Sequence, residues 1–496
     1  MRLTELLSGI RLRRAAPLEL ANAEVAGLEY DSRRVQAGYL FFAFPGSKAD
    51  GREFARAALE RGAVAVASES AAPAGLEARW IEVEHGRQAL AGAARLFYAK
   101  PDEQVALTGI TGTNGKTTTG FLIDAVLRAA GLTTALVGTI EYRLAGRVMP
   151  AVNTTPESLD LIRLLDELRA AGGTHATMEV SSHALELGRV YGLQFHTAVF
   201  TNLTRDHLDF HLTMEAYGAA KQKLFTGAGA GAPAPAFAVL NRDDSFARGL
   251  RVGPETQVLW YGLGQDTDLR ALHIAAGGRG LRFEVQYAKQ RFAVESPLLG
   301  KINVYNILAA CGVGLSYGLA PETIARGIAS LQAVPGRFER VDAGQPFVVV
   351  VDYAHTPDAL QNIIAVARGL NPKRVITLFG CGGDRDRTKR PLMGQAAAEL
   401  SDFVVLTSDN PRSEDPLTIM NDALVGIRRV DKPLIVEPDR ATAIARALDE
   451  AREGDLVILA GKGHETYQVL HDRTIAFDDR AVAREVLRGY GYHSQD

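Results

Sequence analysis

The stretch Leu107–Gly120, LTGITGTNGKTTTG, combines glycines, threonines and a lysine in a pattern that can bind phosphate. The common phosphate loop has four residues between its first glycine and the glycine before the lysine. Here there are five, and Gly112 lies among them. A glycine turn with a surface lysine is the alternative. The strand-like run before the loop and the helical spacing after it favour phosphate, with Lys116 near the terminal phosphates and the Thr117 hydroxyl on Mg²⁺.

We expect the nucleotide to be ATP. The sequence lacks both a downstream Asn-Lys-x-Asp signature for guanine and the LSGGQ run of transport ATPases. The unusual loop therefore belongs to neither of these common subclasses.

Two further groups of side chains follow apolar runs that we expect to be strands. Glu179 ends THATMEV, where a carboxylate beside a phosphate loop can bind Mg²⁺ or position water, or can be a solvated acid in a turn. The segment TNLTRDHLDFH holds Asp206, His207, Asp209 and His211 within six residues. A transition-metal site, a Mg²⁺ site and a polar helix cap all fit this spacing, so the residues alone leave the choice open.

The C-terminal third carries polar residues after several apolar runs, in the segments DYAHTPDAL, GCGGDRDRTKR, SDNPRSEDP and GKGHE. β-branched strands that alternate with helices predict a parallel sheet covered on both faces. Ligands bind such sheets outside the carboxyl ends of the strands, so we expect a site there. The cluster Arg385, Arg387, Lys389 and Arg390 is either an anion clamp or a solvated charge run.

The elements that must position these residues divide the 496-residue chain into about three domains, because single cores stop growing near roughly 250–300 residues. We expect α/β domains at residues 1–99, 100–333 and 334–496. Pro101, in a polar stretch, marks the first boundary. The segment LHIAAGGRGLRFEVQYAKQRFAVESPL predicts antiparallel strands outside the α/β pattern.

Composition restricts the class of protein. The formal net charge is −3, from 55 basic and 58 acidic residues, which favours neither nucleic acid nor an anionic membrane as a partner. Cys311 and Cys381 are too few for a disulfide framework and fit a reducing compartment. No apolar run approaches the ~18 residues of a membrane helix, and the N-terminus has no signal-peptide core. We expect a cytoplasmic protein.

The order of the motifs closely resembles that of the Mur ligases over essentially the whole chain. The matching stretches are YDSRRVQAGYLFFAFPGSKADGREF, TGTNGKTTT, NTTPESLDL, MEVSSHAL, TNLTRDHLDFH, AYGAAKQKLF, INVYNILAA, VPGRFERV, VDYAHTPDAL, GCGGDRDRTKRPLMG, TSDNPR and GKGHE. In this resemblance the five-residue spacing is the family's own GTNGKT loop. The implied fold is a small uridine-binding α/β domain, a central P-loop-type ATPase domain and a C-terminal Rossmann-like domain.

The resemblance implies ATP-dependent amide formation on a nucleotide-sugar peptide. The D-glutamate γ-carboxylate of UDP-N-acetylmuramoyl-L-alanyl-D-glutamate would attack the γ-phosphate of ATP, and an amino group would then displace phosphate from the acyl phosphate. The ATP-binding residues implied are Gly112, Thr113, Asn114, Gly115, Lys116, Thr117 and Thr118, with Asn306, Arg337 and Asp352 at adenine, phosphate and ribose. The nucleotide-sugar residues implied are Tyr30, Ser32, Ser47, Lys48, Ala49, Asn153, Thr154, Thr155, Ser181 and Arg189. Leu187 departs from the glutamine of some relatives, so one substrate contact is expected to be absent.

Two Mg²⁺ ions are also implied by the resemblance. Thr117 and Glu179 would bind one of them. His207 and a carbamylated Lys221 would bind the other, although the sequence alone presents Lys221 as an ordinary helix-surface lysine. An unmodified ammonium has no acceptor for a metal, whereas a carbamate supplies the oxygen that Mg²⁺ prefers. Lys116, Lys221, Glu179 and His207 are the expected catalytic residues.

The added amino acid is expected to be meso-diaminopimelate. Asn410-Pro411 makes a turn that would aim Arg412 into the cleft, and an arginine fork matches the extra carboxylate of diaminopimelate. The DNPR motif occurs in diaminopimelate-adding Mur ligases. The residues implied for this amino acid are Arg385, Asp409, Asn410, Pro411, Arg412, Gly461 and Glu465.

Three alternatives remain open. The added amino acid could be L-lysine or L-ornithine. The chain could be a folylpolyglutamate synthase, which would lack the N-terminal domain, or a P-loop regulatory NTPase. We expect a monomer whose partners are its small-molecule substrates.

Overall fold

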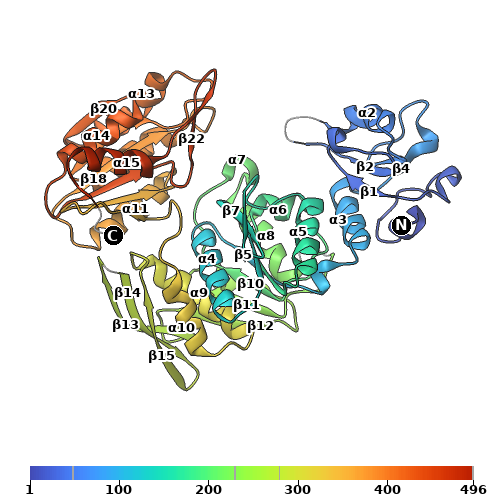
Figure 1. The fold of residues 1–496 in the computed structure, drawn as a ribbon, viewed down its shortest axis with the longest axis horizontal. Helices are drawn as coiled ribbons and strands as arrows, with labels where there is room; N and C mark the ends of the chain where they lie inside the picture. Colours follow the sequence, from blue (N-terminus) through green and yellow to red (C-terminus); the bar gives the residue numbers. More distant parts are fainter. Residues whose placement is uncertain (47–49, 228–230, 279, 494–496) are drawn as a thin grey trace. The chain divides into compact units, whose positions relative to one another are not determined.

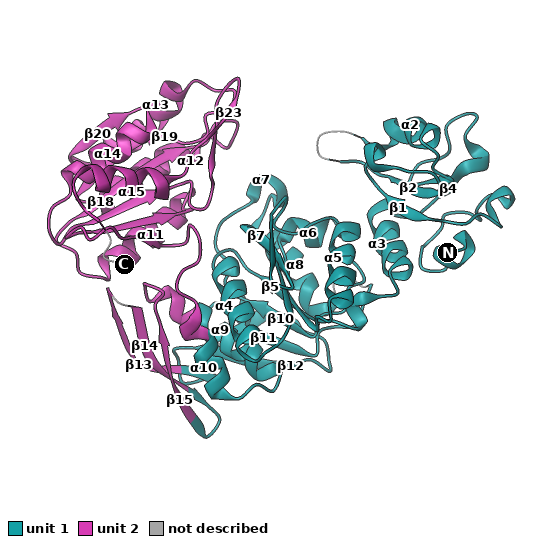
Figure 2. Ribbon diagram, viewed as in Figure 1, with its two compact units in different colours: residues 1–270, 286–290, 306–327 teal, residues 271–285, 291–305, 328–496 magenta. Residues whose placement is uncertain are grey.

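A computed structural model describes residues 1–46, 50–227, 231–278 and 280–493. The chain forms two compact units (Figure 2). Unit 1 contains residues 1–270, 286–290 and 306–327, and unit 2 contains residues 271–285, 291–305 and 328–496. In the part of the chain that is described, no helix is both long and apolar enough to cross a membrane.

The N-terminal block of unit 1 is built on a parallel sheet with the order β1-β2-β3-β4. Side chains of β2 alternate between two cores: Leu40 and Phe42 pack with residues of α3, and Phe41 packs with residues of α2. The elements are α1 (Leu3–Leu7), η1 (Leu18–Leu20), β1 (Gly27–Glu29), η2 (Ser32–Arg34), β2 (Tyr39–Ala43), η3 (Gly51–Phe54), α2 (Ala55–Glu60), β3 (Ala65–Ser68), η4 (Glu77–Arg79), β4 (Trp80–Glu82) and α3 (Gly86–Phe97).

The central block of unit 1 has the strand order β12-β11-β10-β5-β9-β6-β7-β8. The pairs from β12 to β6 are parallel, and β7 and β8 add an antiparallel edge. The elements are η5 (Pro101–Glu103), β5 (Ala106–Thr111), α4 (Lys116–Ala129), β6 (Thr134–Val137), β7 (Glu141–Leu144), β8 (Arg147–Pro150), α5 (Ser158–Ala170), β9 (His175–Glu179), α6 (Ser182–Glu186), β10 (Thr197–Phe200), α7 (Leu208–His211), α8 (Met214–Gln222), η6 (Lys223–Thr226), β11 (Phe237–Asn241), η7 (Ala247–Gly249) and β12 (Gln257–Gly262).

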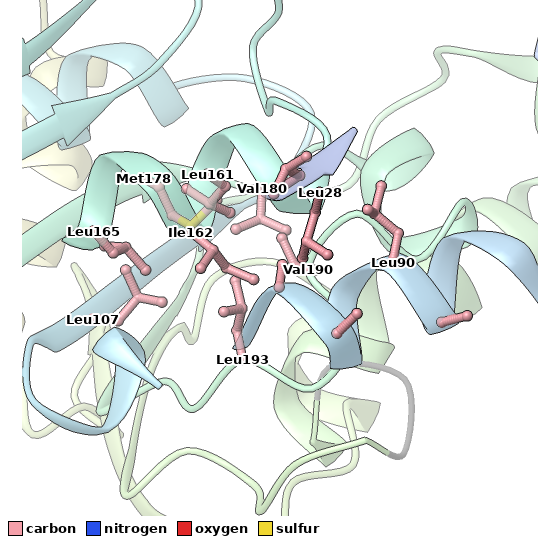
Figure 3. Packing of buried hydrophobic residues seen from close by; sticks show 14 of the residues in the cluster. Leu28, Leu90, Leu107, Leu161, Ile162, Leu165, Met178, Val180, Val190 and Leu193 are labelled. Atoms are coloured by element: carbon pink, nitrogen blue, oxygen red, sulfur yellow. The ribbon is translucent and has the colours of Figure 1, made fainter. Parts of the chain in front are cut away.

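One continuous core joins the two blocks of unit 1. Helix α5 presents Leu161, Ile162 and Leu165 to the sheet, where they meet Leu107 of β5 and Met178 of β9 (Figure 3). Leu28 of β1 and Leu90 of α3 belong to the same cluster. Helices α3 and α5 lie side by side (Figure 1). The N-terminal block is therefore packed onto the central block through apolar side chains.

The predicted excursion between the second and third blocks is present as strands. The segment contains β13 (Leu269–Gly277), β14 (Gly280–Tyr287) and β15 (Gln290–Ser296), which are neighbours in the sheet order. Strand β13 begins in unit 1, where Leu269 and Arg270 pair with β12. Two helices follow, α9 (Ile302–Ser316) and α10 (Pro321–Ser330).

Unit 2 contains a sheet with the order β16-β17-β21-β18-β19-β20, parallel except for β16. Val350 of β17 packs with residues of α11, α12 and α13, whereas Val349 and Val351 pack with residues of α14 and α15. The elements are β16 (Glu339–Val341), β17 (Val348–Asp352), α11 (Pro357–Arg368), β18 (Val375–Cys381), α12 (Lys389–Leu400), β19 (Phe403–Ser408), α13 (Pro416–Ile427), β20 (Leu434–Glu437), α14 (Arg440–Glu450), β21 (Leu456–Ala460), β22 (Tyr467–Val469), β23 (Thr474–Ala476) and α15 (Asp479–Gly489).

The α/β class expected for all three blocks is confirmed. The doubly covered parallel sheet follows from the uninterrupted β-branched strands, which need apolar partners on both faces. The boundaries at residues 99/100 and 333/334 stay a prediction.

Candidate functional site

The phosphate loop lies between β5 and α4, as the sequence predicts. Gly112 has a φ of 140° and Gly115 a φ of 87°, which L side chains rarely adopt. A side chain at Gly112 would overlap the hydroxyl of Thr201, and one at Gly115 would lie 2.5 Å from Asn306 Oδ1. The loop thus needs glycine at both positions because of conformation and space.

The end of the neighbouring strand β10 braces this loop. The backbone N–H of Thr113 donates to the Asn202 carbonyl at 2.8 Å, and that of Asn114 donates to Asn202 Oδ1 at 3.0 Å. The Thr201 hydroxyl donates to the Asn114 carbonyl at 2.7 Å. Sequence reasoning missed Thr201 and Asn202. The available signal was their position at the end of TAVF, a strand that pairs with the loop's own strand.

We predict that Gly112→Ala destabilises the protein by about 2 kcal/mol or more, because the new methyl group meets both an unfavourable φ and Thr201. The displaced loop should bind ATP at least ~10-fold more weakly. Thermal unfolding and ATP titration measure the two effects. Gly131→Ala is the matched control, since Gly131 has a φ of 78° but open space around it. Wild-type ATP affinity in Gly112→Ala would contradict this account of the loop.

Lys116 begins α4 and folds back over the loop. Its Nζ donates to the carbonyls of Gly112 and Thr113, both at 2.9 Å. Thr118 is buried beside it. Asn306, on α9, accepts the Thr119 hydroxyl at 3.3 Å through Oδ1 and so lies against the first turn of α4. The ammonium is therefore held at the loop that would receive phosphate.

Glu179 is buried at the end of β9, next to the loop strand β5. Its carboxylate accepts the Thr117 hydroxyl at 3.1 Å, the Thr139 N–H at 2.8 Å and the Thr139 hydroxyl at 3.1 Å. Gly138 leaves room for it, since a side chain there would lie 2.5 Å from Glu179 Oε1. Hydroxyl and carboxylate oxygens are hard donors of the kind Mg²⁺ takes, so Thr117 and Glu179 fit that ion. Thr139 is a further residue that sequence reasoning missed.

Lys221, on α8, is buried rather than on a helix surface. Its Nζ donates to the Gly112 carbonyl at 2.9 Å and lies 4.3 Å from the centre of the Tyr217 ring. Lys116 donates to the same carbonyl. Burial first, and then the neighbouring Lys116 ammonium, lower the pKa of Lys221 well below its usual value. The site therefore favours a neutral amine at this position.

His207 lies close to this amine, in a left-handed conformation with a φ of 53°. Its Nε2 is 3.5 Å from Asp206 Oδ2, and its ring contacts those of His183 and Tyr217. Burial is the main cause that lowers the pKa of His207 to about 4, so the imidazole is neutral near pH 7 and its nitrogen can bind a metal. Among the described residues, no group of three or more His, Cys, Asp or Glu side chains is placed to hold a metal ion.

Several residues expected at the nucleotide sugar lie in unit 1 as two groups. In the first, the Tyr30 hydroxyl donates to Asp160 of α5, and Ser32 begins η2. The second lies beside Glu179. There the Tyr142 hydroxyl donates to the Asn153 carbonyl, and the hydroxyls of Thr139 and Thr154 are hydrogen-bonded to each other. The Thr155 hydroxyl lies within hydrogen-bonding distance of the Glu179 carbonyl and the Ser181 hydroxyl, and the Thr155 carbonyl accepts the Arg189 guanidinium. Ser47, Lys48 and Ala49 lie outside the described residues.

In unit 2, polar loops follow β17, β21, β18 and β19, which are adjacent parallel strands. Arg412 has a φ of 53°, and its guanidinium donates to the Gly383 carbonyl at 2.7 Å. Gly383 must be small, because a side chain there would overlap the Pro411 carbonyl. The loops after β18 and β19 are thus packed together around Arg412.

The side chains of Asn410 and Glu465, which come from two different loops, are hydrogen-bonded to each other. Asn410 Nδ2 donates to Glu465 Oε2 at 2.9 Å, and Lys462 Nζ contacts both side chains. Below them Arg440 and Asp479 form a fully buried ion pair, and Arg440 also donates to the carbonyls that end β19 and β21. A side chain at Gly461 would lie 3.0 Å from Asp409 Oδ2.

The basic cluster after β18 is only partly available for a ligand. Arg385 is exposed, but Arg390 is buried between Glu414 and Asp422, and Arg387 also binds Asp422. Neither a single anion clamp nor a solvated charge run describes the whole cluster, because Arg387 and Arg390 are paired with carboxylates of the chain. Their carboxylate partners lie on α13 and the turn before it, more than twenty residues away in sequence.

Arg337 and Asp352 meet at the end of β17. Asp352 accepts the N–H groups of Phe338 and Ala354 at 2.7 and 2.9 Å. Burial raises the pKa of Asp352, and Arg337 opposes this shift. The Arg337 guanidinium lies over the Tyr353 ring, 5.1 Å from its centre.

Comparison with protein-family models gives three matches along the chain. Residues 24–98 match the Mur ligase family catalytic domain, residues 110–314 match the Mur ligase middle domain, and residues 336–463 match the Mur ligase glutamate ligase domain. Together these matches reach the polar loops of both units.

Curated relatives match the chain over nearly its whole length. The UDP-N-acetylmuramoyl-L-alanyl-D-glutamate–2,6-diaminopimelate ligase of Solibacter usitatus (strain Ellin6076) is 74% identical over 99% of each chain. The protein of the same name from Geobacillus thermodenitrificans (strain NG80-2) is 46% identical over 94% of this chain and 96% of its own. A solved structure of a ligase of that name is 34% identical, with a TM-score of 0.70, over 99% of this chain and 100% of its own. On these matches, the chain belongs to the Mur ligase family.

Proposed function

We propose that the chain is an ATP-dependent amide ligase that joins meso-2,6-diaminopimelate to the D-glutamate γ-carboxylate of UDP-N-acetylmuramoyl-L-alanyl-D-glutamate. The observation that carries this proposal is the 74% identity over 99% of each chain with the relative named for that substrate and amino acid. The phosphate loop in unit 1 and the Arg412 loop in unit 2 supply the binding chemistry for ATP and for the extra carboxylate.

The reaction proceeds in two displacements. A γ-carboxylate oxygen of the substrate attacks the γ-phosphorus of ATP, the bond to the β-phosphate oxygen breaks, and ADP leaves. The amino nitrogen of diaminopimelate then attacks the acyl carbon, loses a proton, and inorganic phosphate leaves. When ATP binds, the Lys116 ammonium donates to phosphate oxygens instead of the loop carbonyls, and its positive charge offsets the negative charge of the phosphates.

Thr117 and Glu179 would hold one Mg²⁺, and His207 and Lys221 the other. Mg²⁺ supplies positive charge that screens the repulsion between the carboxylate and the phosphates. Lys221 can serve only as a carbamate, which forms when its neutral amine attacks CO₂ and loses a proton. Its burial and its proximity to Lys116 favour the neutral amine that this step requires.

We predict that Lys221→Ala lowers kcat by about 100-fold, since a metal ligand is lost, and that acetate partly restores activity by occupying the place of the carbamate. Initial rates with and without acetate measure this. Lys223→Ala is the control, because Lys223 is a half-buried neighbour whose ammonium is paired with Glu186. An active wild-type enzyme whose intact mass and crystal structure contain only unmodified Lys221 would refute the assignment.

The remaining site residues are assigned from the resemblance of their motifs to those of the Mur ligases. Asn306, Arg337 and Asp352 bind the nucleoside and phosphates of ATP. Tyr30, Ser32, Ser47 to Ala49, Asn153 to Thr155, Ser181 and Arg189 bind the nucleotide-sugar dipeptide. The amino acid contacts Arg385, Asp409 to Arg412, Gly461 and Glu465.

Phosphate release tests the proposal against a regulatory NTPase. We expect release to require both the nucleotide-sugar dipeptide and an amino acid, with one phosphate per amide formed. Release from ATP alone at the full rate would refute the ligase. Activity with a folate and glutamate in place of these substrates would instead indicate a folylpolyglutamate synthase.

A further inference from the structure

Lys462 is a buried cation at the amino-acid loops to which the motif interpretation gives no role. It follows β21 by two residues, and its side chain is fully buried. Its Nζ lies 3.1 Å from Asn410 Oδ1, 3.0 Å from Glu465 Oε2 and 3.7 Å from Asp409 Oδ1. Burying an ammonium is costly unless acceptors surround it, so these contacts account for its position.

The contacts also fix the orientation of the neighbouring groups. Asn410 Oδ1 accepts both the Lys462 ammonium and the backbone N–H of Val469, the latter at 2.9 Å. Asn410 Nδ2 must then point to Glu465 Oε2, to which it donates at 2.9 Å. Both bonds to Glu465 reach Oε2, so Oε1 is the oxygen with which this carboxylate can accept an ammonium from a ligand.

Lys462 also separates like charges. Asp409 and Glu465 both face its ammonium, and Arg440, which Asp479 holds in a two-bond pair, also interacts with both carboxylates. Without Lys462, the buried Asp409 would lose one of the cations that lower its pKa while Glu465 would still raise it, so the pKa of Asp409 would rise.

We propose that Lys462 is a positioning residue of the amino-acid site, whose ammonium holds Asn410 and Glu465 in the arrangement that binds an amino group of the incoming amino acid. The inference rests on the proposed function. Lys462 touches protein groups rather than the reacting atoms, so it acts on amino-acid binding through Asn410 and Glu465.

The test compares Lys462→Met, which keeps an apolar stem, with Lys462→Arg, which keeps the charge. We expect Lys462→Met to raise the KM for diaminopimelate about 30-fold or more, because a buried hydrogen-bonded cation is lost. The KM values for ATP and for the nucleotide-sugar dipeptide should change less than about threefold, since their residues lie elsewhere. Lys462→Arg should have a KM for diaminopimelate between those of Lys462→Met and the wild type. Lys373→Met, at an exposed position of unit 2, is the matched control.

A pH profile separates positioning from a merely structural role. Burial already raises the pKa of Asp409 and Lys462 opposes that shift, so in Lys462→Met the pKa of Asp409 should rise further; the KM for diaminopimelate should then fall as the pH increases from about 6 to about 8.5 and this carboxylate ionises. The wild-type KM should change little over that range. The charged and titratable groups that interact with Glu465 or Asp409 include Lys462, Arg440, Asp479, Cys381, Tyr353 and Tyr467.

Each outcome has a separate meaning. A wild-type enzyme that does not use diaminopimelate refutes the proposed function. An active wild type with an unchanged KM in Lys462→Met overturns the role of Lys462. An equal increase in every KM together with a lower Tm would also overturn it, because the lysine would then only support the fold. If Lys462→Met fails to fold, Lys462→Gln, which keeps an N–H donor without the charge, replaces it in the same comparison.

Discussion

Replacing Lys116 by alanine should lower kcat by about 10³-fold, which corresponds to about 4 kcal/mol of transition-state stabilisation. Negative charge develops between the substrate carboxylate and the γ-phosphate, and Lys116 is the cation that the loop holds at its own carbonyls. Its loss leaves that charge without a fixed protein cation at the loop. Single-turnover formation of product measures the effect.

Tm and ATP affinity must accompany this measurement, because Lys116 also bonds two loop carbonyls. We expect the Tm to fall by only a few degrees. The Lys223→Ala control should retain the wild-type rate. A Lys116→Ala variant that folds and keeps more than a tenth of the wild-type kcat would contradict the role assigned to this lysine.

The second large effect concerns Arg412. In the wild type we expect a preference for meso-diaminopimelate over L-lysine of about 10⁴-fold in kcat/KM, because lysine would leave the guanidinium without a carboxylate partner. Arg412→Ala should lower kcat/KM for diaminopimelate by about 10³-fold and abolish most of the preference. Initial rates with each amino acid measure both changes.

Arg412→Lys keeps the charge but not the two-pronged geometry, so it should recover only part of the activity. Arg473→Ala, at an exposed position between β22 and β23, is the matched control and should behave as the wild type. If Arg412→Ala kept the full preference for diaminopimelate, another residue would have to bind the second carboxylate.

The sequence predicts those parts of the site that are local in the chain. The phosphate loop needs only a strand, glycines and a helix in succession, and Glu179 is recognisable because it ends an apolar strand. Arg412 is recognisable for the same reason, since it follows β19 through an Asn-Pro turn. Strand periodicity also predicts the doubly covered sheet of unit 2.

Features created by distant partners could not be predicted from residue patterns. Lys221 has the pattern of a surface lysine, but its acceptor at Gly112 is 109 residues away in sequence. Lys462 meets Asn410 across 52 residues, and Arg390 meets carboxylates of another helix and its preceding turn. Such environments depend on which strand ends become neighbours, and strand order is not encoded in local spacing.

Product analysis with competing amino acids tests the central claim most directly. The protein is incubated with ATP, Mg²⁺, UDP-N-acetylmuramoyl-L-alanyl-D-glutamate and equal concentrations of meso-diaminopimelate, L-lysine and L-ornithine. The products are then identified by mass and counted against released phosphate. The account predicts the diaminopimelate adduct almost exclusively, with one phosphate for each amide. Equal or greater formation of the lysine or ornithine adduct, or phosphate release without any adduct, would contradict it.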